Sequence, residues 1–145
     1  MTEDELPESL AEIRDDFLDL PEPERLQLLL EFSQELPEAP PEYADHPELY
    51  ERVAECQSPV FIAIELEGDV VTMHATAPEE APTTRGFASI LAQGLSGLTA
   101  AEVLAVPDDF PQSIGLTRVV SPLRISGMTG MLLRAKRQVR AKAMM

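Results

Sequence analysis

The stretch VFIAIELEGDVVTMHAT, residues 60–76, decides the fold of this chain. Apolar residues alternate with others in two runs, 60–66 and 71–76, and the sequence Glu-Gly-Asp separates the runs at 67–69. Alternation with a period of two is typical of a strand with one buried face, and a glycine between two such runs is typical of a tight turn. The stretch therefore predicts an antiparallel hairpin.

The residues before this hairpin predict two helices, a loop and a third strand. Leucine, isoleucine and phenylalanine recur at helical spacing over 7–18 and 23–36, and Pro21 separates the two segments. Residues 37–49 are rich in proline and acid, which predicts an extended loop that wraps the surface and contains no helix. Residues 50–53 could then add a third strand on the far side of the loop that contains Cys56.

The residues after the hairpin predict further helices. Phe87, Ile90, Leu91 and Leu95 lie on one face of a helix, which we expect to end at Gly94 and Gly97. Thr99 can cap a short helix through Val103, with Glu102 at the position of a capping box. Residues 107–111 read as a loop, and one apolar stripe over 125–139 predicts a long final helix. The fold class is α+β: one small antiparallel sheet with several helices packed against it.

Length and composition fit one domain over residues 1–145, with residues 1–8 frayed. The chain contains no tryptophan and few other aromatic residues, so its core must be mainly aliphatic. No apolar run approaches the roughly 20 residues that span a membrane. The N-terminus is acidic, unlike that of a secretory signal. We therefore expect a cytoplasmic protein without a membrane segment, and the sequence leaves a homodimer open.

The charge of the chain is unevenly distributed. The net charge is −15, yet residues 111–145 carry seven basic and no acidic residues. An acidic protein is repelled by phosphate backbones, which argues against general nucleic-acid binding. The basic C-terminal residues could hold a local anionic partner, but complementing the dipole of the final helix is the stronger interpretation; they are Arg134, Lys136, Arg137, Arg140 and Lys142.

Cys56 is the only cysteine, which excludes an intramolecular disulfide and a metal site built from several thiolates of this chain. A lone cysteine is often a small buried apolar residue. The polar neighbours Glu55, Gln57 and Ser58 favour a reactive thiol in a loop before the strand. The carboxylate of Glu55 disfavours the thiolate, so a functional Cys56 needs a nearby cation. His46 and His74 lack any feature that ties them to the thiol, and we interpret both as structural or solvated.

Three segments resemble the SufE family. The sequence CQSPVF at 56–61 is similar to the family signature Gly-Cys-x-Ser-x-Val-Trp. The sequence RGFASIL at 85–91 looks like the family's basic-Gly helix start, and SPLRISGM at 121–128 matches its Ser-x-x-Arg-x-x-Gly segment. Each segment alone is weak, but the three occur in the right order with fitting spacing.

The resemblance implies a SufE/NifU-like fold and a role in sulfur transfer for iron–sulfur cluster assembly. Cys56 would take sulfur as a persulfide from a SufS-like cysteine desulfurase, stimulate that enzyme, and pass the sulfur to a SufBCD-like scaffold. The pyridoxal phosphate belongs to the desulfurase, and this chain would hold no cofactor or metal. Gln57 and Ser58 would shape the cysteine loop, Arg124 would lie near the thiol, and Arg85 would be a supporting basic residue. A shallow apolar pocket would shelter Cys56.

Three positions depart from the family pattern. Glu55 replaces a glycine, Phe61 replaces a tryptophan, and residues 76–84 replace a Ser-Asp-rich turn. Whether the protein is itself an enzyme stays open. The alternatives are a cluster scaffold, which needs more thiolates than this chain has, a thiol redox protein, and a non-catalytic acidic interaction module.

Overall fold

The computed structural model describes residues 6–144 and contains one antiparallel sheet of three strands in the order β1-β2-β3. The strands are β1 Glu51–Arg52, β2 Phe61–Glu67 and β3 Val70–Thr76. The β2–β3 register pairs Ile62 with Ala75 and Ile64 with Met73, so the apolar residues of both strands share one face. The predicted hairpin, the third strand and the α+β class are confirmed.

Seven α-helices and two 3₁₀ turns accompany the sheet in the described part of the chain. The α-helices are α2 Glu8–Leu18, α3 Arg25–Gln34, α4 Pro41–Ala44, α5 Pro82–Leu95, α6 Ala100–Ala105, α7 Phe110–Ser113 and α8 Pro122–Ala143. The 3₁₀ turns are η1 Glu22–Glu24 and η2 Pro47–Leu49. The predicted capping box of α6 is present, with Thr99 accepting from the Glu102 amide and Glu102 accepting from the Thr99 amide.

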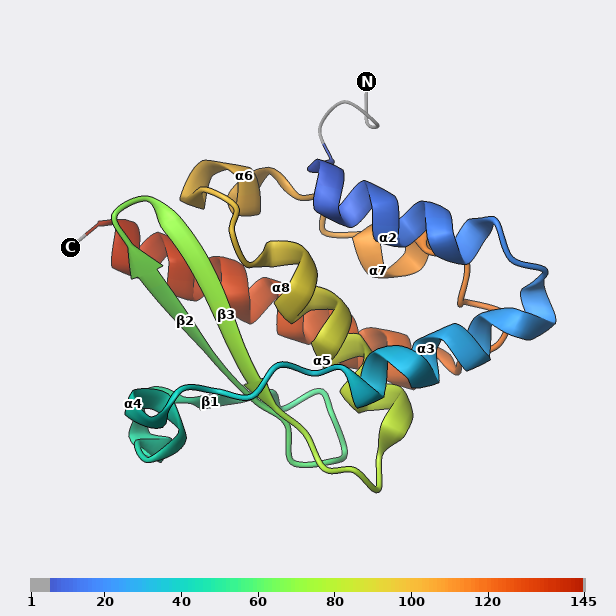
Figure 1. The fold of residues 1–145 in the computed structure, drawn as a ribbon, viewed down its shortest axis with the longest axis horizontal. Helices are drawn as coiled ribbons and strands as arrows, with labels where there is room; N and C mark the ends of the chain where they lie inside the picture. Colours follow the sequence, from blue (N-terminus) through green and yellow to red (C-terminus); the bar gives the residue numbers. More distant parts are fainter. Residues whose placement is uncertain (1–5, 145) are drawn as a thin grey trace.

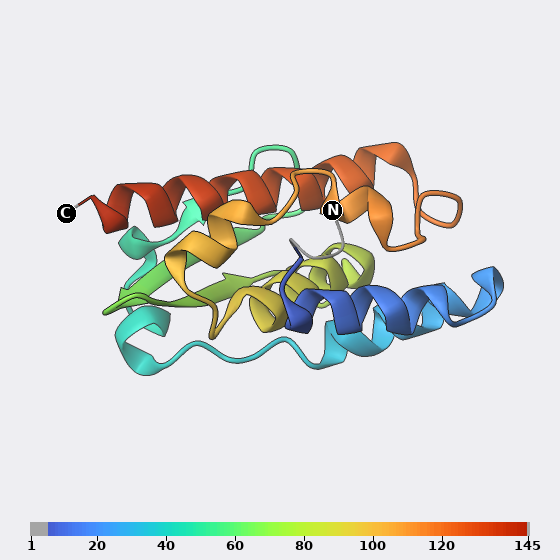
Figure 2. The ribbon, with the colours of Figure 1, turned by 90° about the horizontal axis from the view of Figure 1, so that it is seen from above.

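Both faces of the sheet are covered (Figures 1 and 2). Helix α8 lies along the face that carries Ile62 and Ile64, and the segment that contains α4 crosses the opposite face. There the ring of Tyr43 lies 4.2 Å from that of His74, which is buried and pairs with Glu65 at 2.9 Å. Of the two interpretations of His74, structural or solvated, the structure shows the structural one, because the proline-rich segment covers this face.

One hydrophobic cluster connects the sheet to α2, α3, α5 and α8. Helix α5 contacts β3 as well as α2, α3 and α8, and therefore lies at the centre of the molecule. The cluster is mainly aliphatic, as the composition predicts. Its aromatic members include Phe17 and Phe32, which stack with ring centroids 5.8 Å apart.

Two expected loops contain short helices instead. The segment 37–49 forms α4 and η2, and the segment 107–111 runs into α7. In each of these elements a proline occupies one of the first two positions. A backbone N–H at these positions has no acceptor within the helix, so proline, which lacks the N–H, fits there. The prediction of loops without helix was therefore wrong because these prolines start turns and do not interrupt longer helices.

Gly94 lies inside α5 and does not end that helix, which continues to Leu95. A Cβ atom at position 94 would clash with Cδ2 of Leu10, so glycine lets α2 approach α5 closely. Gly97, with φ of +94°, does follow the end of the helix. The glycine at 94 therefore serves packing between helices.

The frayed N-terminus was expected to reach residue 8. Residues 1–5 lie outside the described residues. Leu6 packs against the core and α2 starts at Glu8, so this expectation was wrong for residues 6–8. Packing of the apolar Leu6 side chain against the core orders the chain at this point.

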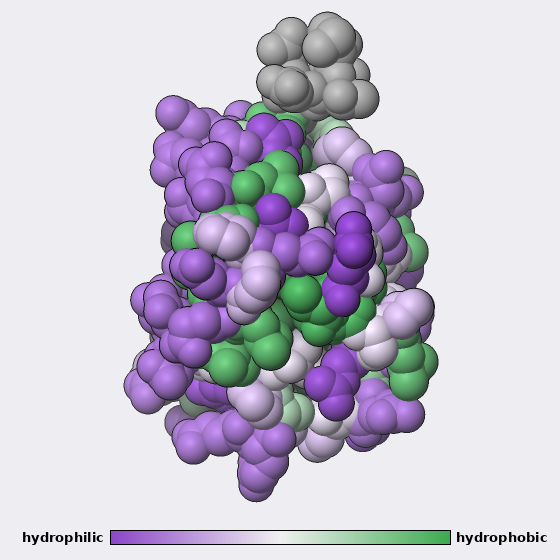
Figure 3. Space-filling model, turned by 90° about the vertical axis from the view of Figure 1, so that its right-hand side faces the viewer, coloured by the Kyte–Doolittle hydropathy of each residue, from purple (hydrophilic) through white to green (hydrophobic). Residues whose placement is uncertain are grey.

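The end of the molecule where α2 turns into α3 shows hydrophobic side chains among hydrophilic ones (Figure 3). In this region Leu18 and Leu26 are 44% and 38% exposed.

Every helix within residues 6–144 is too short or too polar to cross a membrane.

Candidate functional site around Cys56

Cys56 lies in the loop that joins β1 to β2, as the sequence predicts. The Val53 amide donates to the Val60 carbonyl at 2.9 Å, which extends the strand pairing up to the base of the loop. The Cys56 amide donates to the Val53 carbonyl at 3.1 Å, which folds the loop back on itself. Pro59 has no N–H to donate, so regular pairing resumes after it. The cysteine is thus fixed at a defined point beside the sheet.

Two glycines of α8 bring the loop close to that helix. A Cβ atom at Gly127 would lie 2.9 Å from the Cys56 sulfur, and one at Gly130 would lie 2.6 Å from Oε1 of Glu55. Real Cβ atoms do not approach other atoms so closely. A side chain at Gly127 or Gly130 would therefore displace the Cys56 sulfur or the Glu55 carboxylate from its observed position. Gly127 belongs to the third motif of the sequence, but its function in packing against the thiol could not be read from the motif.

A cavity of about 220 Å³ adjoins the thiol. Its walls come from the cysteine loop, from the start of α5 with the residues before it, and from the start of α8. Cys56, Gln57, Ser58 and Arg124 all line it, so the structure brings these four predicted residues together. We expected an apolar shelter. Most side chains around the cavity are polar, namely Glu55, Gln57, Ser58, Glu80, Thr83, Thr84 and Arg124. The apolar expectation was wrong because three polar segment ends meet here.

The thiol is held in its protonated form. Cys56 is 7% exposed. Burial, and secondly the carboxylate of Glu55, raise its pKa to about 11, while Arg134 and Arg52 act in the opposite direction. At neutral pH the resting protein therefore presents almost no thiolate.

Arg134 and Arg52 are the cations that lower the pKa of Cys56 in this state, and sequence reasoning missed both. The sequence predicts that Arg134 complements the dipole of the final helix. It instead pairs through Nη1 with Oε1 of Glu55 at 2.5 Å, 79 residues away in the chain. This hydrogen bond holds the pKa of Glu55 below its usual range. Of the basic C-terminal residues, Arg140 and Lys142 do lie in the last turn of α8.

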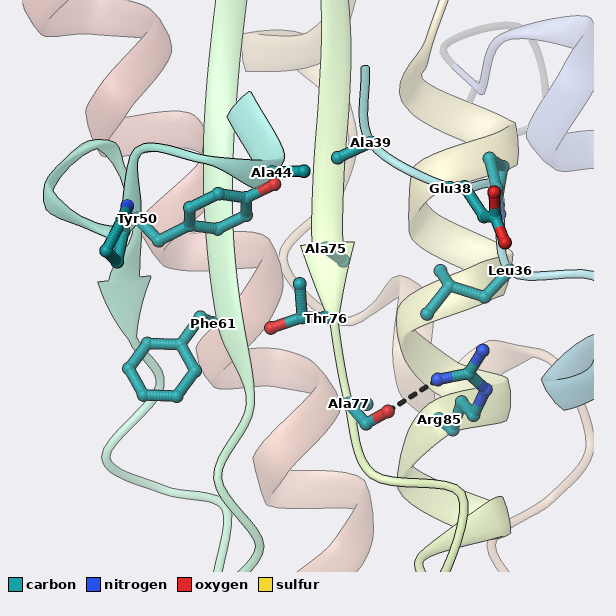
Figure 4. Close-up of a pocket in the computed structure, with 12 residues that line it drawn as sticks. Leu36, Glu38, Ala39, Ala44, Tyr50, Phe61, Ala75, Thr76, Ala77 and Arg85 are labelled. Carbon is teal, nitrogen blue, oxygen red and sulfur yellow. Dashed lines mark hydrogen bonds between the residues drawn. The ribbon is translucent and has the colours of Figure 1, made fainter. Parts of the chain in front are cut away.

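Arg85 lies apart from the cysteine site. Its Nε donates to the Ser33 carbonyl at 2.9 Å. Its Nη1 donates to the Ala77 carbonyl at 2.5 Å, as Figure 4 shows. It thereby fastens the end of α3 and the chain after β3 to the start of α5. The same side chain lines a second cavity of about 520 Å³ between the proline-rich segment and the end of the hairpin, and Cys56 does not line this cavity.

No cluster of three or more His, Cys, Asp or Glu side chains suited to a metal ion occurs within residues 6–144. His46 is exposed and pairs with Glu48 at 2.9 Å. His74 is buried on the sheet face beneath Tyr43. Both histidines thus have local partners and neither lines the cavity of Cys56.

Comparison with known proteins identifies the family of the chain. The family model described as SufE, the Fe-S metabolism associated domain, matches residues 11–139. The chain belongs to the SufE family. Two SufE-like proteins from strains of Mycobacterium tuberculosis, whose names call them uncharacterized, are each 49% identical over 136 residues, which is 93% of this chain and 94% of theirs.

The SufE fold is also found in a solved relative. The solution structure of a hypothetical protein from Thermus thermophilus has a TM-score of 0.85 and 37% identity, and the match covers 97% of this chain and 99% of that one. A shorter match, of 38% identity over 56 residues, joins 39% of this chain to 15% of the SufE-like protein 1 of Arabidopsis thaliana, which is named as chloroplastic/mitochondrial. Membership in SufE assigns the chain a role in iron–sulfur metabolism.

Proposed function

We propose that this SufE protein accepts a sulfur atom on Cys56 from the persulfide of a cysteine desulfurase and delivers it for iron–sulfur cluster assembly. One observation carries the proposal: the only thiol of the chain adjoins a polar cavity that Arg124 also lines. An always-protonated guanidinium there can stabilise a sulfur anion. Arg124 is exposed, so it can also meet a docked partner.

The transfer needs no external oxidant or reductant. The Cys56 thiolate attacks the terminal sulfur of the desulfurase persulfide, R–S–SH, and a new S–S bond forms to Cys56. The S–S bond of the donor breaks, its electron pair stays on the donor cysteine, and that cysteine leaves as a thiolate. The products are the Cys56 persulfide, with its proton on the terminal sulfur, and R–S⁻, so atoms and charge balance.

The resting protein is unsuited to spontaneous attack. A buried thiol whose pKa is raised to about 11 offers little thiolate and little access. We infer that the desulfurase activates Cys56 when it docks, by uncovering the loop or by bringing a cation to it. The same closed state limits loss of the thiol to other oxidants, which disfavours a peroxidase function.

Delivery of sulfur requires the reverse roles. The terminal sulfur of the Cys56 persulfide becomes the electrophile for a thiolate of the recipient, and Cys56 leaves as a thiolate. We propose a cluster-assembly scaffold as that recipient. Stimulation of the desulfurase then follows, because removal of its persulfide frees its cysteine for the next turnover.

The test combines this protein with a cysteine desulfurase and free cysteine, followed by mass spectrometry of the intact chain and of its peptides. We expect a gain of one sulfur atom that maps to Cys56 and is removed by a reducing agent. Cys56→Ser should gain nothing and should not stimulate desulfurase turnover. Equal stimulation by Cys56→Ser, or no sulfur on the wild type, would contradict the proposal. Rapid consumption of peroxide would instead support a thiol redox protein.

A further inference from the structure

The cysteine loop is fastened to α8 by a network of charges that begins beside the thiol. Glu55 pairs with Arg134 at 2.5 Å, and Glu51 lies 3.5 Å from Nε of the same guanidinium. Glu51 also pairs with Arg137 and accepts from Nε2 of Gln138 at 2.9 Å. These contacts connect β1 and the loop, on one side, with successive turns of α8 on the other.

Arg134 divides its donors between two carboxylates. Its side chain is 20% exposed, and its Nε lies 3.5 Å from Glu51 without a hydrogen bond to any of the described residues. Its Nη1 donates to Glu55 at 2.5 Å, so this is the donor that displacement of Glu55 would release. Cys56 follows Glu55 in the chain, and its sulfur becomes anionic during sulfur transfer.

The charges near Cys56 come from four elements. Glu55 of the loop opposes the thiolate, whereas Arg134 of α8 and Arg52 of β1 favour it. Glu80, before α5, and Arg124, at the start of α8, line the adjoining cavity. Of these, Arg134 is the cation that both favours the thiolate and pairs directly with the opposing carboxylate of Glu55, the residue next to Cys56 in the chain.

We propose that Arg134 is a positioning residue shared between Glu55 and the sulfur of Cys56, and that displacement of Glu55 turns this cation toward the sulfur anion. In the closed state Glu55 retains the guanidinium and anchors the loop to α8. When Glu55 leaves, the loop loses this anchor and Nη1 of Arg134 loses its carboxylate partner, while Glu51 stays 3.5 Å from Nε. That Arg134 moves from Glu55 to the Cys56 sulfur during sulfur transfer rests on the proposed function. That Arg134 can change between these two partners does not depend on it.

The experiment measures the alkylation of Cys56 by iodoacetamide between pH 7 and pH 10.5, without any desulfurase. In Glu55→Gln, loss of the carboxylate should lower the pKa of Cys56. A fall of about one unit gives tenfold more thiolate, partly offset by the lower nucleophilicity of a more acidic thiol. We therefore expect alkylation at pH 8 to be about three- to tenfold faster than in the wild type, with a plateau that moves to lower pH.

Arg134→Gln should act in the opposite direction. The thiolate loses its cation while Glu55 stays, so the rise of the rate with pH should shift to higher pH. Arg134→Lys retains the charge and should restore most of the wild-type profile. In the double variant Glu55→Gln/Arg134→Gln, the gain from Glu55→Gln should be mostly lost, because that gain depends on the released guanidinium.

The control is Glu22→Gln, which removes a carboxylate from the remote pair of Glu22 and Arg118 at 3.6 Å. It should leave the alkylation profile unchanged. A purely structural role of Arg134 would change thermal unfolding in both single variants but would leave the pH midpoint of alkylation at its wild-type value, and this result would overturn the proposal. Persulfide transfer from a desulfurase is measured separately, so a failure of sulfur transfer leaves the alkylation result interpretable.

Discussion

At the scale of the residue, the site is defined by a thiol that the protein keeps neutral. The polar loop sequence favours a reactive cysteine, yet the folded chain buries Cys56 to 7% exposure and raises its pKa to about 11. The burial comes from residues distant in the chain, and the adjacent Glu55 adds to the rise in pKa. Under the proposed function, this closed state would make reaction of the thiol depend on the docked desulfurase.

The raised pKa of Cys56 predicts a specific pH dependence of stability. An unfolded cysteine loses its proton near pH 8.5, whereas the folded one keeps it up to about pH 11. The unfolded state therefore releases a proton first, and the free energy of unfolding should fall as the pH rises through this window. We expect the wild type to lose stability relative to Cys56→Ser between pH 8 and pH 10, measured by urea unfolding. A constant difference over this range would contradict the burial of a neutral thiol.

Gly127 predicts a second effect at the residue scale. In Gly127→Ala the new methyl group would lie 2.9 Å from the sulfur, so the thiol must be displaced from its place beside α8. Alanine also favours the helix by up to about 1 kcal/mol, which offsets part of the strain. We expect Cys56 to be alkylated several times faster while the melting temperature changes little. An unchanged rate would show that the loop tolerates the methyl group in place.

At the scale of the element, α8 forms one wall of the site along its length. Its first turns contribute Arg124 and Gly127, and later turns contribute Arg134 to the charge network. Lys136 on the same helix is 4% exposed and donates to the Val106 carbonyl and, at 2.7 Å, to Asp108. The basic helix therefore binds acidic and carbonyl groups of other segments, in addition to the dipole effect of its last turn.

The packing of α2 on α5 gives a prediction for helix contacts. Gly94→Ala places a methyl group against Cδ2 of Leu10, in the core, where no space is left for it. Overpacking of this kind costs about 1–3 kcal/mol. We expect that loss in the free energy of unfolding by urea denaturation. The matched control Leu10→Ala/Gly94→Ala removes the clashing side chain but leaves a smaller core residue. It should therefore show a smaller loss than the two single changes added together.

At the scale of the whole molecule, the fold brings three distant segments to one cavity. The cysteine loop, the start of α5 and the start of α8 are far apart in sequence and meet around the thiol. The acidic first part and the basic last part of the chain also meet there, through the pairs of Glu51 and Glu55 with α8. The sheet thus carries the cysteine, and α8 sets its environment.

Transfer between two molecules is the property in which Arg124 should matter. It is exposed and lines the cavity, but it is not among the cations that lower the pKa of Cys56 in the resting protein. Arg124→Gln should therefore leave alkylation of the free protein near the wild-type rate, yet slow sulfur transfer from a desulfurase by about tenfold, which corresponds to roughly 1.4 kcal/mol. Arg118→Gln, at an arginine whose side chain is 81% exposed, is the control. Equal transfer by Arg124→Gln would remove this residue from the site.

The sequence by itself determined the features that depend on near neighbours. Alternation over 60–76 predicted the hairpin, Thr99 and Glu102 predicted the capping box, and Pro59 placed Cys56 in a loop before the strand. These features could be read because hydrogen bonds and side-chain directions within one element follow from its own residues. The resemblance of the three motifs to those of the SufE family, in their order and spacing, also predicted the family.

Only the tertiary structure decided what surrounds the thiol. The pairing of Arg134 with Glu55 spans 79 residues, and the contact of Gly127 with the sulfur depends on the path of α8 past the loop. Neither leaves a local pattern, which is why Arg134 was assigned to the helix dipole and Arg85 to the site. The pKa of a thiol depends on its burial and on charges within a few ångströms. Those quantities exist only once distant segments have packed together.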